Sequence, residues 1–320
     1  MRRRLSFSRA TLVPALAAVS AVLAVPLLLA GGCSGSDEDV EVSVKGAFGS
    51  RPEVSFPEEA PGAELAVKTV AGGRGAEARK GDLVVADYVG YRWNKDGSRL
   101  LANSYITGRP GAFPTGRLVP GLERALAGAK VGSRVVAKIP PKDGYGDRGA
   151  MQHQVGAGDT LLYVLDVRAI YTGSAAARGR AQPLDDPRLP KVGDARPGQG
   201  PSVTVPKTAP PRSLQVRTLI EGQGAPVAKG RLLALQYVGV FWRDGKAFES
   251  SWKAGRPYAA TIGTGQVMKG WDQALVGQRV GSRLLLVVPP SLGYGKQGLP
   301  QAGIKGDDTL VFVVDILGAH

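Results

Sequence analysis

An internal repeat limits what this chain can fold into more than any other feature of its sequence. Positions in the two halves match at a constant offset of 149 residues. The matched pairs run through both halves: Val54 and Val203, Tyr88 and Tyr237, Trp93 and Trp242, Tyr145 and Tyr294, Asp166 and Asp315. So many matches at one offset indicate a duplication, which predicts two domains of one fold. The offset slips between Asp96 and Gly121, where the first copy has a rearranged loop.

Each copy has the pattern of β structure with one short helix. Strand-like segments in the second copy are rich in Leu, Val and aromatic residues and bounded by Gly and Pro, at residues 232–242, 283–288 and 309–317. A helical spacing of three and four links Trp271, Ala274, Leu275 and Gln278. We therefore expect an α+β fold, with each domain a curved antiparallel sheet wrapped on one short α-helix.

Composition predicts the order of the domains and connecting segments along the chain. We expect a leader over 1–32, a tether over 33–50, a first domain over 51–172, a Pro- and Gly-rich linker over 173–200 and a second domain over 201–320. The linker has the composition of an extended, semi-stiff spacer. The tether is small and polar with several acidic residues.

The first thirty residues have the pattern of an export signal. Four arginines precede the apolar run 12–30, which ends in small residues. Leu29-Ala30-Gly31-Gly32-Cys33 resembles a bacterial lipobox, with Ala30 at the position that is usually more apolar. That resemblance implies that Cys33 carries two acyl chains, which suffice for stable anchoring on the outer face of the cytoplasmic membrane. The alternative is a conventional signal peptide with an incidental cysteine.

Composition excludes several other classes of function. The net charge is +14, which can attract an anionic membrane or wall polymer, although a solvated basic surface is the simplest interpretation. The sequence has no arginine-rich helix, zinc pattern or aromatic platform, so we expect no nucleic-acid binding. It has a single cysteine, and its two histidines, His153 and His320, lie far apart in sequence without acidic partners at ligand spacing. We therefore expect no metal site and no His-dependent nucleophile.

The second copy resembles an FKBP-type peptidyl-prolyl isomerase domain over nearly the whole of residues 214–320. The residues that carry the resemblance are Tyr237, the run Asp244-Gly245-Lys246-Ala247-Phe248-Glu249-Ser250-Ser251, Tyr258, Val267-Met268, Gly270-Trp271, Tyr294-Gly295, Ile304 and Phe312. With its leader, the chain resembles a bacterial, actinobacterial-like lipoprotein that carries such domains in tandem.

The resemblance implies a shallow apolar pocket that takes a proline ring. Its floor would be Trp271, its walls Tyr237, Phe248, Val267, Met268 and Phe312, and its rim Tyr258, Tyr294 and Ile304. Of these, the implied catalytic set is Tyr237, Phe248, Trp271, Tyr294 and Phe312 together with Glu249, and the implied substrate-binding set is Tyr258, Val267, Met268 and Ile304. The implied partners are proline-containing polypeptides, with macrolides as a further class of ligand. No cofactor is implied, because turning an amide needs no nucleophile, base or metal. The oligomeric state is not predicted.

Each pocket residue also has a structural interpretation. Taken singly, Trp271, Phe248 and Phe312 would be ordinary core, and a tyrosine such as Tyr237 would be half-buried with a satisfied hydroxyl. Their joint order favours the pocket. One departure stands out, because Glu249 occupies a position where the family usually has aspartate. Whether the longer side chain reduces activity stays open at this stage.

The first copy departs further from the family pattern. Leu122 occupies the position that corresponds to Trp271. The pair Phe248-Glu249 corresponds to Leu100-Leu101 or to Leu101-Ala102, depending on where the alignment gap falls. Likewise, either Gly111 or Phe113 corresponds to Tyr258, again depending on the gap. Five pocket positions persist, at Tyr88, Leu118, Val119, Tyr145 and Tyr163. We expect the same fold with an eroded pocket and little activity, which leaves weak polypeptide binding, spacing or packing as its role.

These patterns favour an exported, membrane-tethered prolyl isomerase that assists the folding of exported proteins mainly through its second domain. One alternative is a chaperone-like lipoprotein that holds unfolded chains in two cradles, gaining avidity from the tandem arrangement. Another is a structural lipoprotein that attaches to acidic cell-wall polymers.

Overall fold

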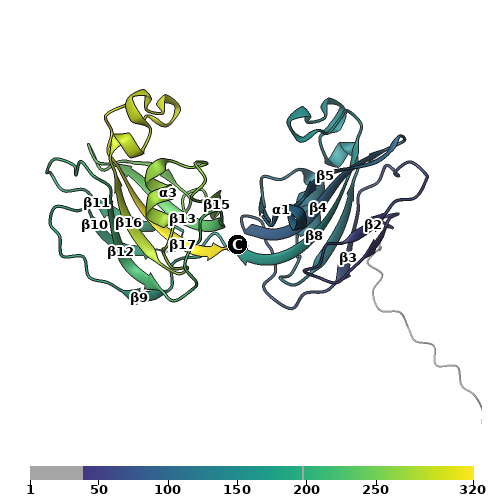
Figure 1. Ribbon diagram of the computed structural model, residues 1–320, viewed down its shortest axis with the longest axis horizontal. Helices are drawn as coiled ribbons and strands as arrows, with labels where there is room; N and C mark the ends of the chain where they lie inside the picture. Colours follow the sequence, from purple (N-terminus) through teal and green to yellow (C-terminus); the bar gives the residue numbers. More distant parts are fainter. Residues whose placement is uncertain (1–38, 197) are drawn as a thin grey trace, which may run out of the picture. The chain divides into compact units, whose positions relative to one another are not determined.

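The computed structural model describes residues 39–196 and 198–320 (Figure 1). The predicted leader and Cys33 lie outside these residues. No helix in the described part of the chain is long and apolar enough to cross a membrane.

The first domain is built on one antiparallel sheet. Along the sheet the strands are β3 (Ala66–Ala71), β7 (Arg134–Ile139), β8 (Thr160–Tyr171), β4 (Leu83–Asn94) and β5 (Gly97–Asn103), and β6 (Gly111–Pro114) also pairs with β4. The helical segments are α1 (Ser104–Thr107), α2 (Pro120–Leu126) and the 3-10 turns η1 (Pro141–Asp143), η2 (Gly146–Arg148) and η3 (Met151–His153).

The second domain repeats this topology. Its strands run β14 (Ala247–Ser250), β13 (Leu232–Phe241), β17 (Leu310–Ala319), β16 (Arg283–Val288), β12 (Gln215–Gly222) and β9 (Gly179–Ala181), with β15 (Tyr258–Thr261) on β13. The helical segments are α3 (Lys269–Leu275), η4 (Pro290–Leu292), η5 (Gly295–Gln297) and η6 (Pro300–Ala302). The expected α+β architecture, with two domains of one fold, is confirmed.

In both domains a glycine lets the longer helix lie close against the sheet. A Cβ on Gly270 of α3 would come within 2.6 Å of Val288 Cγ1, and one on Gly121 of α2 within 2.3 Å of Ile139 Cγ2. Trp271, Ala274 and Leu275 are then buried against β13, β16 and β17 in the core of the second domain. This close approach carries the residue after the glycine, Trp271 or Leu122, to the inner face of the sheet.

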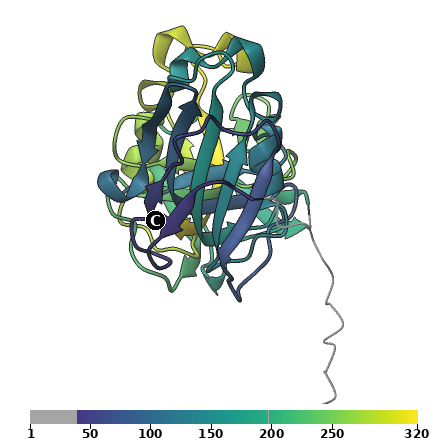
Figure 2. The same cartoon turned by 90° about the vertical axis from the view of Figure 1, so that its right-hand side faces the viewer.

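A hairpin covers the outer face of each sheet, the face opposite the longer helix. It consists of β1 (Ser43–Lys45) and β2 (Glu53–Ser55) in the first domain, and of β10 (Lys191–Arg196) and β11 (Gly200–Thr204) in the second. Val54 packs on the first outer face and its repeat partner Val203 on the second. Figure 2 shows the purple hairpin segment lying over the long strands of the first domain.

These hairpins differ from the expected tether and linker. Residues 39–50 pack on the first domain, where Val40 is buried and Gly49 donates a hydrogen bond to Asp166. Residues 173–200 contain strands β9 and β10, and β9 pairs with β12 of the second domain. Composition favoured extended spacers there because proline and glycine obscure the short apolar alternation that the hairpins use.

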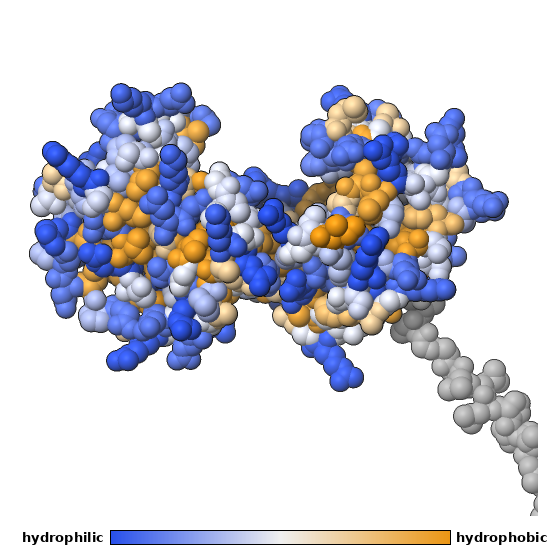
Figure 3. All heavy atoms as spheres, in the orientation of Figure 1, coloured by the Kyte–Doolittle hydropathy of each residue, from blue (hydrophilic) through white to orange (hydrophobic). Residues whose placement is uncertain are grey.

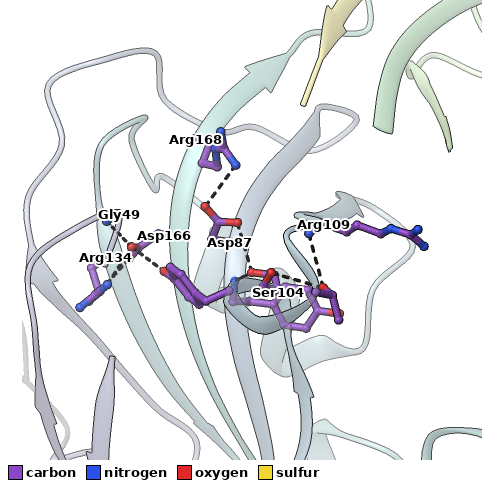
Figure 4. Close-up of polar contacts among 10 residues, drawn as sticks. Gly49, Asp87, Ser104, Arg109, Arg134, Asp166 and Arg168 are labelled. Atoms are coloured by element: carbon purple, nitrogen blue, oxygen red, sulfur yellow. Dashed lines mark hydrogen bonds and ion pairs between the residues drawn. The ribbon is translucent and has the colours of Figure 1, made fainter. Parts of the chain in front are cut away.

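A buried ion pair fixes the first hairpin to its sheet. Arg134 on β7 meets Asp166 on β8 at 2.6 Å, and both side chains are essentially inaccessible. Arg134 also donates to the carbonyl oxygens of Gly46 and Ser50, and Asp166 accepts from the Tyr105 hydroxyl. Figure 4 shows Asp166 between Arg134 and the backbone N–H of Gly49, from which it also accepts. These bonds satisfy both charges, which would otherwise be costly to bury. Arg283 and Asp315 form the matching pair in the second domain at 2.6 Å.

Candidate active site

The second domain contains a cavity of about 530 Å³ floored by the Trp271 indole. Trp271 is 4% exposed and is held on the inner face of the sheet by α3. The lining residues are Tyr237, Phe248, Glu249, Tyr258, Gln266, Val267, Met268, Trp271, Gly293, Tyr294, Leu299 and Phe312. The cavity is therefore apolar at its base, with polar groups toward its mouth.

Three rings stand edge-to-face around the indole. Tyr237 lies at a centroid distance of 5.2 Å and 86° from Trp271, and Phe312 lies at 5.3 Å and 83°. Tyr258 closes the third side at 6.3 Å and 76°. Edge-to-face contacts hold aromatic rings in fixed orientations, so the indole face stays open toward the cavity between rigid walls. The geometry suits a flat, ring-sized apolar group.

Glu249 reaches the Tyr237 hydroxyl despite its extra methylene. Burial, and then a hydrogen bond from this hydroxyl to the Glu249 carboxylate, raise the pKa of Tyr237 well above its ordinary value of 10.0. The Glu249 side chain itself is exposed at the mouth of the cavity. Burial also raises the pKa of Tyr258 and of Tyr294, with the nearby Glu249 charge adding to both shifts. All three phenols are therefore neutral donors at physiological pH.

Two further donors in the pocket have no acceptor within the described protein. The Trp271 indole N–H is buried without a partner. The backbone N–H of Met268 likewise has no acceptor among the described residues, whereas its carbonyl accepts from Trp271 N–H and Asp272 N–H. A buried donor without a partner is unusual in a folded protein and is often explained by a functional role. Of the two, the Met268 N–H belongs to a residue that lines the cavity wall and is the one we take as available to a ligand carbonyl.

Asp272 holds the segment that carries two of the pocket residues. Its carboxylate accepts from the backbone N–H groups of Gly263 at 2.6 Å and Gly265 at 2.7 Å, just before Val267 and Met268. Glu123 of the first domain does the same for Gly116 at 2.6 Å and Leu118 at 2.7 Å. The sequence argument missed this residue, although an acidic side chain in the first helical turn at matched positions of both copies was a usable signal.

The structure brings together all but one of the expected pocket residues. Tyr237, Phe248, Glu249, Tyr258, Val267, Met268, Trp271, Tyr294 and Phe312 line one cavity. Ile304, expected at the rim, is 3% exposed and packs in the core instead. It bridges to Leu299 through the backbone, and Leu299 takes the place at the cavity. A loop of glycines and 3-10 turns has no fixed periodicity, so the sequence could not tell which of its apolar residues faces the ligand.

Strand register decides which residues of the first domain correspond to Phe248, Glu249 and Tyr258 of the second. Gly90 pairs with Ala102 as Gly239 pairs with Glu249, so the pair Leu101-Ala102 answers to Phe248-Glu249. Ala86 pairs with Gly111 as Leu235 pairs with Tyr258, so Gly111 answers to Tyr258. The first domain thus lacks the acidic residue, the rim tyrosine and the indole.

Comparison with known proteins agrees with this geometry. The family model described as FKBP-type peptidyl-prolyl cis-trans isomerase matches residues 75–168 and 224–317, once in each domain. The two matches together cover more than half of the chain, which therefore belongs to the FKBP-type peptidyl-prolyl cis-trans isomerase family.

Three similar proteins each match about one domain's length of this chain. The FK506-binding protein of Streptomyces anulatus is 38% identical over 117 residues, covering 37% of this chain and 94% of that protein. The peptidyl-prolyl cis-trans isomerase FKBP2 of Bos taurus is 41% identical over 117 residues, covering 36% of this chain and 82% of its own. Among solved structures, AtFKBP13 is 33% identical with a TM-score of 0.32, covering 35% of this chain and 97% of its own.

Proposed function

We propose that the second domain catalyses cis–trans isomerisation of X-Pro peptide bonds, and that the first domain contributes little of this activity. The observation that carries the proposal is the Trp271 floor with its rigid aromatic walls. The first domain has Leu122 in place of the indole and Ala102 in place of the carboxylate. An X-Pro segment would place its ring on Trp271 and its carbonyl oxygens at the mouth.

The chemistry is a rotation, so the site works by favouring the twisted amide over the planar one. Amide resonance sets a barrier of about 18–20 kcal/mol, and uncatalysed exchange at proline takes tens to hundreds of seconds. Resonance makes the planar amide polar, and the apolar pocket stabilises that form less than the twisted one. Donors aimed at the carbonyl oxygen hold it in place while the C–N bond turns.

Tyr294 and Met268 are the donors that we assign to the substrate carbonyl. Tyr294 lies at the cavity mouth, and burial keeps its hydroxyl protonated by raising its pKa. The Met268 N–H faces no acceptor among the described residues. The Tyr237 hydroxyl is hydrogen-bonded to Glu249. We therefore assign Tyr237 to the wall of the pocket, where this bond fixes its ring, and not to the substrate carbonyl. Neither donor needs to transfer a proton, since no bond forms or breaks.

A charge placed in the pocket wall tests this proposal. The change Val267→Asp puts a carboxylate beside the proline site without altering the floor, and Val276→Asp puts the same charge on an exposed valine at the end of α3. We expect the full chain to accelerate exchange of a short X-Pro peptide, Val267→Asp to remove most of this, and Val276→Asp to leave it unchanged. Equal rates for the Val267→Asp and unsubstituted chains would contradict the proposal.

We further propose that the enzyme acts on exported proteins from a lipid anchor at Cys33 on the outer face of the cytoplasmic membrane. The support is the charged and apolar leader, followed by the lipobox-like run that ends in the chain's single cysteine. The change Cys33→Ser should move the protein from the membrane fraction to the soluble fraction and abolish labelling by a radioactive fatty acid. Unchanged membrane retention would contradict the anchor.

Macrolides are the second ligand class that we propose for the pocket. The support is a rigid aromatic cavity of about 530 Å³ and the printed name of the Streptomyces relative, an FK506-binding protein. FK506 should inhibit the isomerase activity competitively with the X-Pro peptide. Inhibition that excess peptide fails to relieve would place the macrolide elsewhere.

A further inference from the structure

The buried arginines of the two domains differ in how many hydrogen bonds they donate. Besides its bonds to the paired aspartate, Arg134 of the first domain donates to the carbonyl oxygens of Gly46 and Ser50. Arg283 of the second domain donates through Nε and Nη2 to Asp315 alone among the described residues, so that its Nη1 has no acceptor there. Buried donors are normally paired in folded proteins, so this nitrogen needs an explanation.

The extent of pairing in the two outer-face hairpins explains the missing acceptors. Pairing of β1 with β2 stops at Lys45 and Glu53, and the loop between them supplies the carbonyl oxygens that meet Arg134. Pairing of β10 with β11 continues to Arg196 and Gly200. Residues that form the loop over the arginine in the first domain are therefore replaced by residues of the strand ladder in the second.

The aspartate of the second pair does have a substitute for the loop. Asp166 accepts from the Gly49 N–H at 2.6 Å in the first domain, and Asp315 accepts from the Ala177 N–H at 2.8 Å in the second. The segment before β9 thus provides the donor for the carboxylate and leaves the guanidinium without acceptors. What the second domain lacks at this place is a pair of oxygen atoms.

A cavity of about 430 Å³ lies beside Arg283, between β9, β10 and β12. Its apolar wall includes Leu184, Val192 and Leu219, which pack on the outer face of the sheet. The Arg283 side chain is 9% exposed, against 1% for Arg134, so the guanidinium is almost buried but can be reached from the cavity. Figure 3 shows apolar and polar atoms side by side on the second domain, which carries the labels α3 and β10 in Figure 1.

This cavity is separate from the candidate active site. Side chains alternate between the two faces along a strand. On β16, Leu284 packs in the core that contains Trp271, whereas Leu285 packs on the outer face. Arg283 shares the outer face with Leu285, so a ligand beside Arg283 leaves the indole-floored cavity open.

The charges around the cavity favour a neutral ligand. The Arg283 guanidinium is already balanced by the Asp315 carboxylate, and the exposed Lys191 and Asp194 at the cavity carry opposite charges. A carboxylate ligand would place an uncompensated negative charge beside this buried pair, which is costly. A peptide carbonyl accepts from the guanidinium without adding a charge.

The first domain shows which form of chain meets these donors. Residues 46–50 contain a turn in which the Ser50 N–H donates to the Ala47 carbonyl at 3.1 Å. Gly46 and Gly49 have φ angles of +102° and +83°, a conformation that residues with a side chain rarely adopt. A turn with glycines therefore brings two carbonyl oxygens to one guanidinium.

We propose that the outer-face cavity of the second domain binds a glycine-containing turn of another polypeptide, whose backbone carbonyl oxygens accept hydrogen bonds from Arg283 Nη1. This site goes beyond the proposed isomerase function, because its ligand needs no proline and undergoes no rotation. The bound turn would supply the oxygen atoms that the second hairpin does not, and its side chains would cover Leu184 and Leu219.

The probe is the acetylated and amidated peptide Gly-Ala-Phe-Gly-Ser, which has the sequence of residues 46–50 and carries no charge. It is titrated into the isotope-labelled full chain while NMR follows the Gly193 amide, which lies at the cavity, and the Arg283 Nε–H. We expect saturable shifts at both groups. Absence of saturable shifts, or shifts confined to the Trp271 indole, would overturn the proposal.

Two exposed neighbours on β9 give a matched pair of variants. Ala181 lines the cavity, whereas Arg180 does not. We expect Ala181→Phe to fill part of the cavity and weaken binding at least about tenfold, and Arg180→Phe to leave it within about twofold, since the uncharged probe does not sense the lost charge. Equal affinities for these two variants would overturn the proposal.

The change Arg283→Lys tests the guanidinium itself. Lysine keeps a positive charge beside Asp315 but has no second nitrogen to offer a ligand, so binding should weaken at least about tenfold. A urea titration checks that the variant is folded, and if it is not, the Ala181→Phe and Arg180→Phe pair still decides. Tighter binding of the same peptide with a free carboxylate would contradict the preference for a neutral turn.

Discussion

Glu249 shows how far a single residue can be understood from sequence. The resemblance identified its position and left open whether its longer side chain disables the site. The structure brings its carboxylate to the Tyr237 hydroxyl, which the sequence could not show because the answer depends on a side-chain conformation. Asp272 and Leu299 were missed for a related reason, since one acts through backbone amides and the other lies in an aperiodic loop.

Removal of the Glu249 carboxylate should lower activity without unfolding the protein, because the side chain is exposed. In Glu249→Ala the Tyr237 hydroxyl loses its acceptor, and we expect kcat/KM to fall about tenfold to a hundredfold, the equivalent of one hydrogen bond to a charged group. Glu249→Asp should keep part of the activity, since it retains the charge. An unchanged kcat/KM in Glu249→Ala would show that this carboxylate does not contribute to catalysis.

Tyr237 should make stability depend on pH in alkaline solution. Its pKa is raised in the folded state above the ordinary value of 10.0, so the folded protein holds this proton more tightly than the unfolded chain. The resulting stabilisation is present below pH 10 and is lost as pH rises further, by at most about 1.4 kcal/mol per pH unit. Denaturant titrations should show Tyr237→Phe declining less steeply above pH 10 than the unsubstituted chain. Parallel declines would contradict this.

At the scale of elements, the segment before α3 and the hairpins on the outer faces depend on contacts distant in sequence. Strands such as 232–242 were predictable from their apolar composition, and α3 from the spacing around Trp271. The hairpins were not, because their order comes from packing of residues such as Val54 and Val203 on a sheet formed elsewhere in the chain. Local patterns carry no information about that packing.

The Asp272 carboxylate should control the order of the segment that carries Val267 and Met268. In Asp272→Ala, the Gly263 and Gly265 amides lose their acceptor, so their hydrogen exchange should accelerate and kcat/KM should fall about tenfold. Asp244→Ala is the control, because it also removes a carboxylate that accepts from a turn amide, that of Lys246. Protected Gly263 and Gly265 amides in Asp272→Ala would show that the carboxylate does not order this segment.

The Arg134–Asp166 pair should contribute strongly to the stability of the first domain. In Arg134→Leu the buried Asp166 carboxylate loses its partner, and we expect the free energy of unfolding to fall by about 3–5 kcal/mol. Arg188→Leu breaks the solvent-exposed pair with Asp186 and should cause no measurable change. Urea titrations of both variants compare the two environments. Similar midpoints for the two variants would contradict the assigned role.

At the scale of the whole molecule, the chain is a duplication in which the two copies have diverged at the same site. The repeat itself was readable because Tyr88, Tyr145 and Asp166 recur at one offset as Tyr237, Tyr294 and Asp315. The residue that replaces Tyr258 in the first copy could not be predicted, because Gly111 and Phe113 could be told apart only once the pairing of β4 with β6 was known. Divergence within one fold leaves the second domain with the indole and the carboxylate, and the first domain with Leu122 and Ala102 at those positions.

The most direct test of the account compares two tryptophans of the second domain in an isomerisation assay on the full chain. Trp271 floors the cavity, and Trp252 is equally buried on the outer face of the same sheet. The measured quantity is kcat/KM for cis-to-trans exchange of a short X-Pro peptide. We predict a loss of more than about tenfold for Trp271→Leu and near-normal activity for a folded Trp252→Leu. Full activity in Trp271→Leu would contradict the central claim that the indole-floored pocket of the second domain performs the isomerisation.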